Sequence, residues 1–159
     1  MTRRRAARFG AIQALYQAEL SGVAIERVIA EFQAHRLADL LEPLEGSGPA
    51  PAVDRDWFAA LAKGAWQRAP ELDPMIEATL AEGWTLVRAG YLLRACLRAG
   101  AFELAARPDV PLRVVINEYV ELAHDFLSKE EAGFINAVLD RLAGQLRPTP
   151  EAGPAPAPA

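Results

Sequence analysis

Apolar residues recur every three or four positions along most of this 159-residue chain. That spacing places them on one side of an α-helix, whereas a half-buried strand needs strict alternation, which no segment shows convincingly. We therefore predict an all-α fold with about seven helices. Hydrophobic residues make up 52% of the chain, which is enough to build a packed interior.

Proline and glycine clusters divide the chain into its predicted helices, at about 3–20, 25–41, 54–70, 74–81, 85–106, 112–126 and 129–146. Residues 42–52 are predicted to form a loop. Residues 148–159 lack core-forming side chains and are predicted to be a disordered tail. Residues 1–147 would then form one helical domain with a subdomain break near 70–84, although a break at 42–52 is an alternative.

Local signals also place several helix ends. Asp54 is a candidate N-cap, and Ser128 with Glu131 fits the Ser-x-x-Glu capping box. The first helix has two distinct faces, which predicts packing on two sides. Its bulky face holds Phe9, Ile12, Tyr16 and Leu20, and its small face holds Ala7, Ala11, Ala14 and Ala18.

The chain opens MTRRRAARFG, with arginine at positions 3, 4, 5 and 8, although the net charge of the whole chain is −4. Apart from these four arginines, 13 basic and 21 acidic side chains remain, a balance of −8. Such a block is typical of a solvated arm, a targeting signal or a contact with a polyanion. A secretory signal is disfavoured because Gln13, Gln17 and Glu19 interrupt the apolar run, and a transit peptide because serine first appears at Ser21. With no apolar run of membrane-spanning length, we expect a cytoplasmic protein.

Residues that could support catalysis or bind metal are sparse. The single cysteine, Cys96, excludes an internal disulfide, and His35 and His124 match no metal-ligand spacing. No Ser–His–Asp or Cys–His arrangement stands out. We therefore predict no catalytic residue, no metal site and no cofactor.

Two features of the sequence suggest that the chain binds RNA. Gln13, Tyr16 and Gln17 share one side of the first helix and combine hydrogen-bonding groups with a π-face, as unpaired RNA requires. Tyr16 could equally be a core residue between solvated glutamines. On the last helix, Phe134 lies about 100° outside the apolar stripe that begins at Ile135. It could stack on a base or pack against a neighbouring helix, and both alternatives stay open.

From Val110 the chain reads VPLRVVINEYVELAHDFLSKEEAGFINAVLDRLA. This segment closely resembles the C-terminal signature of the bacterial NusB family of transcription antitermination factors, through residues 110–113, 116–118, 121–123 and 134–140. The start, RRRAARFGAIQALYQAEL, is similar to the family's arginine-rich leader and its QALY segment. LRACLRAGAFEL, residues 93–104, is similar to the helix that precedes the signature.

The resemblance implies two small three-helix bundles packed together and a protein that is not an enzyme. It also implies binding to boxA RNA of ribosomal RNA operons, as a heterodimer with the small-subunit ribosomal protein that acts as NusE. The transcription elongation complex with other Nus factors would be the larger partner. Carried over by position, the RNA-binding residues are Arg3, Arg4, Arg5, Arg8, Gln13, Tyr16, Arg113 and Phe134. None of these motifs marks the ribosomal-protein interface.

Three departures from the family pattern carry expectations. Leu112 stands where an aromatic residue is common, and Gly133 where a basic one can occur, so RNA contacts near Phe134 would be fewer. Gly100 and Ala101 replace larger apolar residues, which predicts looser packing. The rival interpretation is a protein-interaction module or ribosome-biogenesis adaptor without intrinsic RNA specificity. Homodimerisation of the free protein also stays open.

Overall fold

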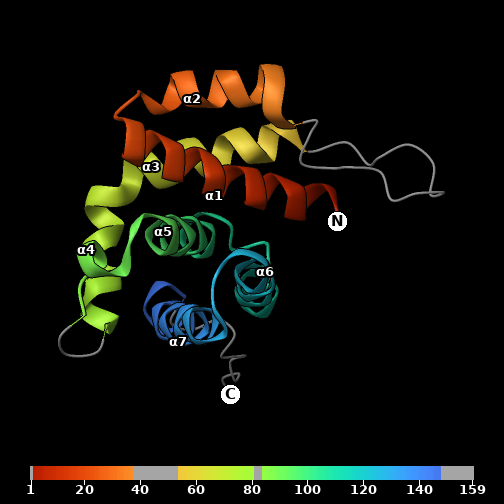
Figure 1. Cartoon of the computed structure of the whole chain (residues 1–159). Helices are drawn as coiled ribbons and strands as arrows, with labels where there is room; N and C mark the ends of the chain where they lie inside the picture. Colours follow the sequence, from red (N-terminus) through yellow and green to blue (C-terminus); the bar gives the residue numbers. More distant parts are fainter. Residues whose placement is uncertain (1, 38–53, 81–83, 148–159) are drawn as a thin grey trace. The chain divides into compact units, whose positions relative to one another are not determined.

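The computed structural model describes residues 2–37, 54–80 and 84–147 (Figure 1). Within these ranges the chain forms seven α-helices, one short π-helix and no strand, which confirms the all-α prediction. The chain divides into two compact units, residues 1–68 and residues 69–159. The predicted loop at 42–52 and the predicted tail at 148–159 lie outside the described residues.

Unit 1 contains α1 (Arg3–Ser21), α2 (Ile25–Glu31), the π-helix η1 (Phe32–Arg36) and the first part of α3 (Arg55–Thr79). The Thr2 hydroxyl accepts a hydrogen bond from the Arg5 amide at the start of α1, and Gly22 ends the helix with a φ of 75°. The rings of Phe32 and Phe58 stack with centroids 5.8 Å apart, so η1 packs on α3. Of the helix predicted at 25–41, the part up to residue 36 is helical and residues 38–41 lie outside the described ranges.

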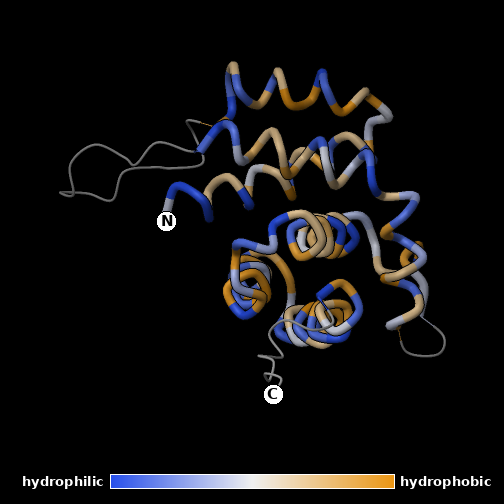
Figure 2. The backbone as a smooth tube through the Cα atoms, turned by 180° about the vertical axis from the view of Figure 1, so that it is seen from behind, coloured by the Kyte–Doolittle hydropathy of each residue, from blue (hydrophilic) through white to orange (hydrophobic). Residues whose placement is uncertain are grey.

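Helix α1 buries its small face completely and its bulky face in part. The four alanines of the small face are fully buried, because a side chain without atoms beyond Cβ lets neighbouring helices approach closely. On the predicted bulky face Ile12 is fully buried, but Tyr16 and Leu20 are 36% and 56% exposed. The bulky face is therefore only partly packed. One side of α1 carries an outward strip of larger side chains that are half-buried or exposed: Arg5, Phe9, Gln13, Tyr16 and Gln17. The N-terminal end of α1 is hydrophilic (Figure 2).

The prediction of separate helices at 54–70 and 74–81 was wrong, because α3 continues through Pro70 and Pro74 to Thr79. Each proline removes one backbone donor, at a cost of about 3 kcal/mol in a helix interior. Packing in unit 2 compensates for this cost. Leu72 and Ile76 are fully buried on the same stretch, and Arg98 donates two hydrogen bonds of 2.9 and 2.7 Å to the Asp73 carboxylate.

The helix predicted at 85–106 is instead divided into α4 (Leu86–Ala89) and α5 (Tyr91–Ala106). Gly90 separates them with a φ of 86° and a ψ of 160°, a conformation open to glycine and costly for other residues. The Thr85 hydroxyl caps α4 by accepting a hydrogen bond of 3.2 Å from the Arg88 amide. The break at Gly90 turns α4 away from α5.

The rest of unit 2 is a bundle of α5, α6 (Leu112–Phe126) and α7 (Lys129–Leu146), seen nearly end-on in Figure 1. A buried hydrogen bond of 2.9 Å runs from the Tyr119 hydroxyl to the Glu103 carboxylate. A Cβ on Gly100 would lie only 2.9 Å from a Leu139 methyl group. The small residue therefore permits close packing of α5 on α7, and the expectation of looser packing was wrong.

The predicted helix ends in unit 2 agree with the structure. Helix α6 has the predicted limits, and α7 begins with the predicted capping box. The Ser128 hydroxyl accepts from the Glu131 amide, and the Glu131 carboxylate accepts from the Ser128 amide, both at 3.0 Å. Near the end of the described chain, the Arg147 guanidinium donates to the carbonyls of Leu104, Arg107 and Val110.

Candidate nucleic-acid interface

The four N-terminal arginines differ in exposure. Arg3 and Arg4 are exposed and Arg5 is half-buried, whereas Arg8 is only 3% exposed. Exposed guanidinium groups can hold a phosphate with several hydrogen bonds, but a buried one must move to do so. Arg3 and Arg4 are thus the most accessible members of the predicted block, and Arg5 is accessible in part.

Trp57, at the beginning of α3, organises this block. Its ring lies 5.4 Å from the Arg4 guanidinium carbon and 5.9 Å from that of Arg8, and the side chain is 4% exposed. Each such cation–π contact contributes about 0.5–1 kcal/mol at an exposed site and more when desolvated. One buried ring therefore supports two arginines that are one helical turn apart.

The position of Trp57 is itself fixed by the predicted N-cap. The Asp54 carboxylate accepts a 3.0 Å hydrogen bond from the Trp57 amide, and the Asp54 amide donates to the Arg3 carbonyl at 3.4 Å. The start of α3 is therefore bonded to the start of α1. The sequence identified Asp54 as a cap, but gave no sign that the residue beside Arg4 would be a tryptophan about fifty positions away.

Gln13 and Tyr16 lie further along the outward strip of α1. Gln13 is half-buried and Tyr16 is 36% exposed, so the alternative of a core tyrosine does not hold. At the end of the strip, Gln17 accepts a hydrogen bond from the Arg36 guanidinium of η1. Sequence reasoning missed Arg36, because its place beside α1 depends on how α2 folds back.

In unit 2 the predicted residues are Arg113 on α6 and Phe134 on α7. Arg113 forms an ion pair with Asp140 at 3.3 Å, with side chains that are 69% and 53% exposed. An ion pair so exposed contributes little and can be exchanged for another anion. Six of the eight predicted residues thus lie on α1 in unit 1, and two lie on different helices of unit 2.

Phe134 is half-buried and packs against Trp84, with ring centroids 5.4 Å apart and planes tilted by 37°. Phe134 therefore packs on a neighbour, but this neighbour precedes α4 and is not part of a helix, and the stacking of Phe134 on a base stays a prediction. Trp84 itself is 49% exposed, because the break at Gly90 leaves α4 at the edge of unit 2. The aromatic pair keeps one accessible face.

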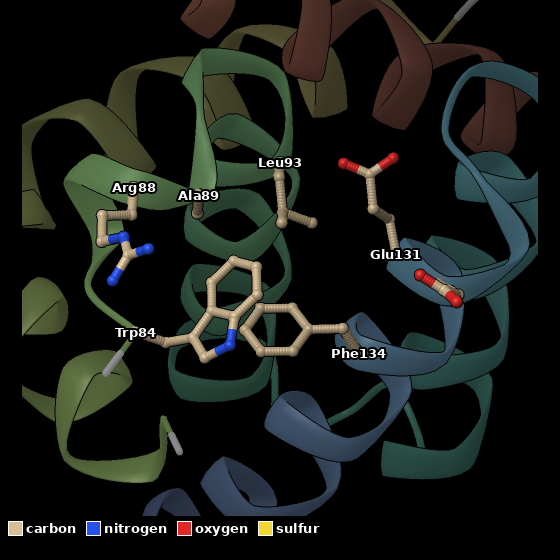
Figure 3. A pocket seen from close by; sticks show the side chains of 7 residues that line it. Trp84, Arg88, Ala89, Leu93, Glu131 and Phe134 are labelled. Carbon is tan, nitrogen blue, oxygen red and sulfur yellow. The ribbon is translucent and has the colours of Figure 1, made fainter. Parts of the chain in front are cut away.

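The two rings border a pocket of about 290 Å³ (Figure 3). It is lined by Trp84, Arg88, Ala89, Leu93, Glu130, Glu131 and Phe134. In Figure 3 the rings of Trp84 and Phe134 lie on one side of the pocket, with Leu93 and Ala89 opposite and Glu131 beside them. The carboxylates of Glu130 and Glu131 outnumber the Arg88 guanidinium, so the pocket favours groups that donate hydrogen bonds over phosphates.

The described residues give little support for a metal site or for a nucleophilic cysteine. They contain no group of three or more His, Cys, Asp or Glu side chains arranged to hold a metal ion. Burial raises the pKa of the Cys96 thiol far above its usual range, so the group stays protonated and a poor nucleophile. Across the same residues, every helix is too short or too polar to cross a bilayer.

Comparisons with known proteins agree with this architecture. The model of the NusB family matches residues 5–144. A transcription antitermination protein NusB from Nitrobacter hamburgensis is 47% identical over 145 residues, which cover 91% of this chain and 88% of the relative. The same fold occurs in T. maritima NusB, at a TM-score of 0.73 and 24% identity over 96% of this chain and 98% of that one.

A further structural relative is a complex of the antitermination factors NusB and NusE with double-stranded RNA. It aligns with a TM-score of 0.67 and 22% identity, covering 91% of this chain and 99% of that one. At this identity the likeness concerns the fold. The family match and the relative at 47% identity both extend over nearly the whole helical region. This chain belongs to the NusB family.

Proposed function

We propose that this chain is a transcription antitermination factor that binds boxA-type RNA of ribosomal RNA operons together with NusE. Family membership supports the role, since curated relatives carry the name transcription antitermination protein. A fold relative seen with NusE and RNA supports the choice of partners. The proposal places the protein in the cytoplasm within the elongation complex, alongside other Nus factors, as an adaptor and not an enzyme.

The observation that carries the RNA contact is the support of Arg4 by the buried ring of Trp57. A cation held in place loses less conformational freedom when it binds a phosphate. Arg3, Arg4 and Arg5 would hold phosphates, whereas the buried Arg8 would position Trp57. Phosphate contacts anchor RNA without reading its sequence.

Base recognition would fall to the other predicted residues. Gln13 and Tyr16 lie on the same outward strip and supply hydrogen bonds and a π-face. In unit 2, Phe134 with Trp84 offers an aromatic surface for a base, and Arg113 offers a further cation. A base amino group could donate to the carboxylates in the pocket, which an RNA phosphate would avoid.

Binding of boxA RNA at two salt concentrations, with and without NusE, tests this proposal. A variant with Arg3, Arg4 and Arg5 changed to alanine should bind more weakly. Its plot of log affinity against log salt should be less steep by about 2, since each phosphate contact on single-stranded nucleic acid contributes about 0.7. Loss of the Arg4–Trp57 contact should cost about 0.5–1 kcal/mol and lower the thermal unfolding temperature by only a few degrees.

The matched control replaces Arg27 and Lys63, two exposed basic residues elsewhere in unit 1, by alanine. It should retain the salt dependence of the parent protein. NusE should tighten RNA binding by the parent. If the parent binds NusE but gains no affinity for boxA RNA, the chain is a protein-interaction module and the RNA proposal is wrong.

A further inference from the structure

The π-helical turn η1 is the most unusual backbone feature of unit 1. It follows α2 directly, and the Leu37 amide donates to the Phe32 carbonyl five residues back. Such turns are rare, occur mostly singly and are frequent at functional sites. Here the wider turn ends with Arg36 beside α1.

Two contacts hold the Arg36 side chain. Its guanidinium lies 4.8 Å from the centroid of the Phe32 ring, which is itself 1% exposed, and it donates a hydrogen bond to the Gln17 side-chain oxygen. The acceptor is a neutral amide and not a carboxylate, so this bond leaves the positive charge of Arg36 uncompensated. Arg36 is exposed to solvent and is nevertheless fixed in place.

The same hydrogen bond sets the orientation of Gln17. Arginine can only donate, so the amide oxygen of Gln17 must face Arg36 and the amide nitrogen, with its two donors, must point elsewhere. Gln17 lies one helical turn beyond Gln13 and next to Tyr16 on the outward strip of α1. Its nitrogen therefore joins the polar groups of that strip.

The outward strip is thereby bounded by cations at both ends. It runs from Arg5 through Phe9 to Gln13 in steps of four residues and ends with Tyr16 and Gln17, three and four residues beyond Gln13. Twelve residues of helix separate Arg5 from Gln17, a rise of about 18 Å. A short single-stranded RNA laid along the strip would meet a guanidinium near each end and hydrogen-bonding and aromatic groups between them.

We infer that Arg36 is a phosphate-binding residue at the far end of this strip, and that it orients Gln17 to donate to the same RNA. The ligand is the phosphodiester backbone of single-stranded RNA, so the inference rests on the proposed function. It extends the binding surface beyond the arginine block to a second element, η1. Arg36 belongs to none of the motifs that suggested RNA binding, and Gln17 was not among the residues carried over from the family.

The first test replaces Arg36 by glutamine and measures boxA RNA binding at two salt concentrations. Affinity should fall roughly 3- to 10-fold at low salt, and the log–log salt slope should become less steep by about 0.7. Arg27→Gln is the matched control, because Arg27 is also an exposed arginine of unit 1, on α2. It should bind RNA like the parent. Arg36→Lys keeps the charge and should lose less affinity than Arg36→Gln.

The second test addresses Gln17. Gln17→Glu places a carboxylate against the Arg36 guanidinium, so the ion pair should preserve folding while it neutralises the charge offered to RNA. RNA affinity should fall at least as far as in Arg36→Gln. When Arg36→Gln is combined with the uncharged Gln17→Ala, the two losses should not add, since both remove the same hydrogen bond. Additive losses would overturn the positioning of Gln17 by Arg36.

The outcomes separate this inference from the proposed function. If the parent protein binds no boxA RNA even with NusE, the proposed function fails and the inference with it. If the parent binds and the arginine-block variant is impaired, but Arg36→Gln matches Arg27→Gln, only the inference is overturned. Thermal unfolding of each variant verifies that the comparison is made between folded proteins.

Discussion

Trp57 in unit 1 and Trp84 in unit 2 use the same side chain in opposite ways. Trp57 is 4% exposed and carries Arg4 and Arg8 against its ring, whereas Trp84 is 49% exposed and packs on Phe134. A buried ring cannot meet a ligand, but it can fix the cations that do. A half-exposed ring contributes less to folding and keeps a face for stacking. The indole of Trp57 thus fixes neighbouring cations, whereas the indole of Trp84 stays accessible for stacking.

The largest expected difference concerns stability. Trp57→Ala should lower the free energy of unfolding by about 3–5 kcal/mol, because it leaves a cavity and removes the ring beneath two guanidinium groups. Trp84→Ala should cost only about 1 kcal/mol, because half of its side chain is already in water. Urea unfolding followed by circular dichroism measures both values. Equal losses of unfolding free energy in the two variants would show that both tryptophans contribute alike to folding, which contradicts the comparison.

When only folded protein is compared, RNA affinity should depend more on Trp84 than on Trp57, which is the opposite of their order for stability. Removing an aromatic ring that stacks on a base costs about 1–3 kcal/mol of binding. Trp84→Ala and Phe134→Ala should each lose that much affinity for boxA RNA, with an unchanged salt slope because no charge is removed. Arg4→Ala should instead make the slope less steep by about 0.7.

Val87→Ala supplies the control for these stacking variants. Val87 is on α4, is 79% exposed and does not line the pocket. Its replacement should leave RNA affinity unchanged, as measured by fluorescence anisotropy of labelled RNA. If Trp84→Ala binds like Val87→Ala, the ring pair serves packing alone.

The tryptophans also show what the sequence could predict. Features encoded within a few residues were found, such as the cap at Asp54 and the capping box of Ser128 and Glu131. The role of Trp57 was not found, because its contacts with Arg4 and Arg8 connect positions about fifty residues apart. The same holds for Trp84 and Phe134. Site residues could be named from the family motif, but the rings beside them could not.

Two wrong predictions have different physical causes. Pro70 disfavours a helix interior, yet α3 continues through it, whereas at Gly90 the helix breaks in a conformation that glycine allows, within a segment that looked continuous. Local preferences amount to about 1–3 kcal/mol per residue, and buried contacts of the surrounding helices can exceed them. Likewise, Arg8 was named as an RNA-binding residue from the family motif, but tertiary packing buries its side chain.

The smallest expected effect comes from making unit 2 electrostatically more like unit 1. Gly133 precedes Phe134, is exposed, and has nothing within 4 Å of where a Cβ would be placed, so a longer side chain fits there. Gly133→Lys would add a cation near a pocket whose carboxylates outnumber its arginine. We expect boxA RNA affinity to rise roughly two- to fivefold at low salt, with a salt slope steeper by up to about 0.7.

Gly133→Ala is needed beside it, because replacing a glycine within α7 also stabilises the helix by about 0.5–1 kcal/mol. Both variants should gain this stability, whereas only the lysine should change RNA binding and its salt dependence. A gain in affinity that the alanine reproduces would come from the helix and not from the charge. If neither variant binds RNA more tightly, while the arginine-block variant is impaired, then phosphates meet the protein at unit 1 and the unit 2 pocket receives bases alone.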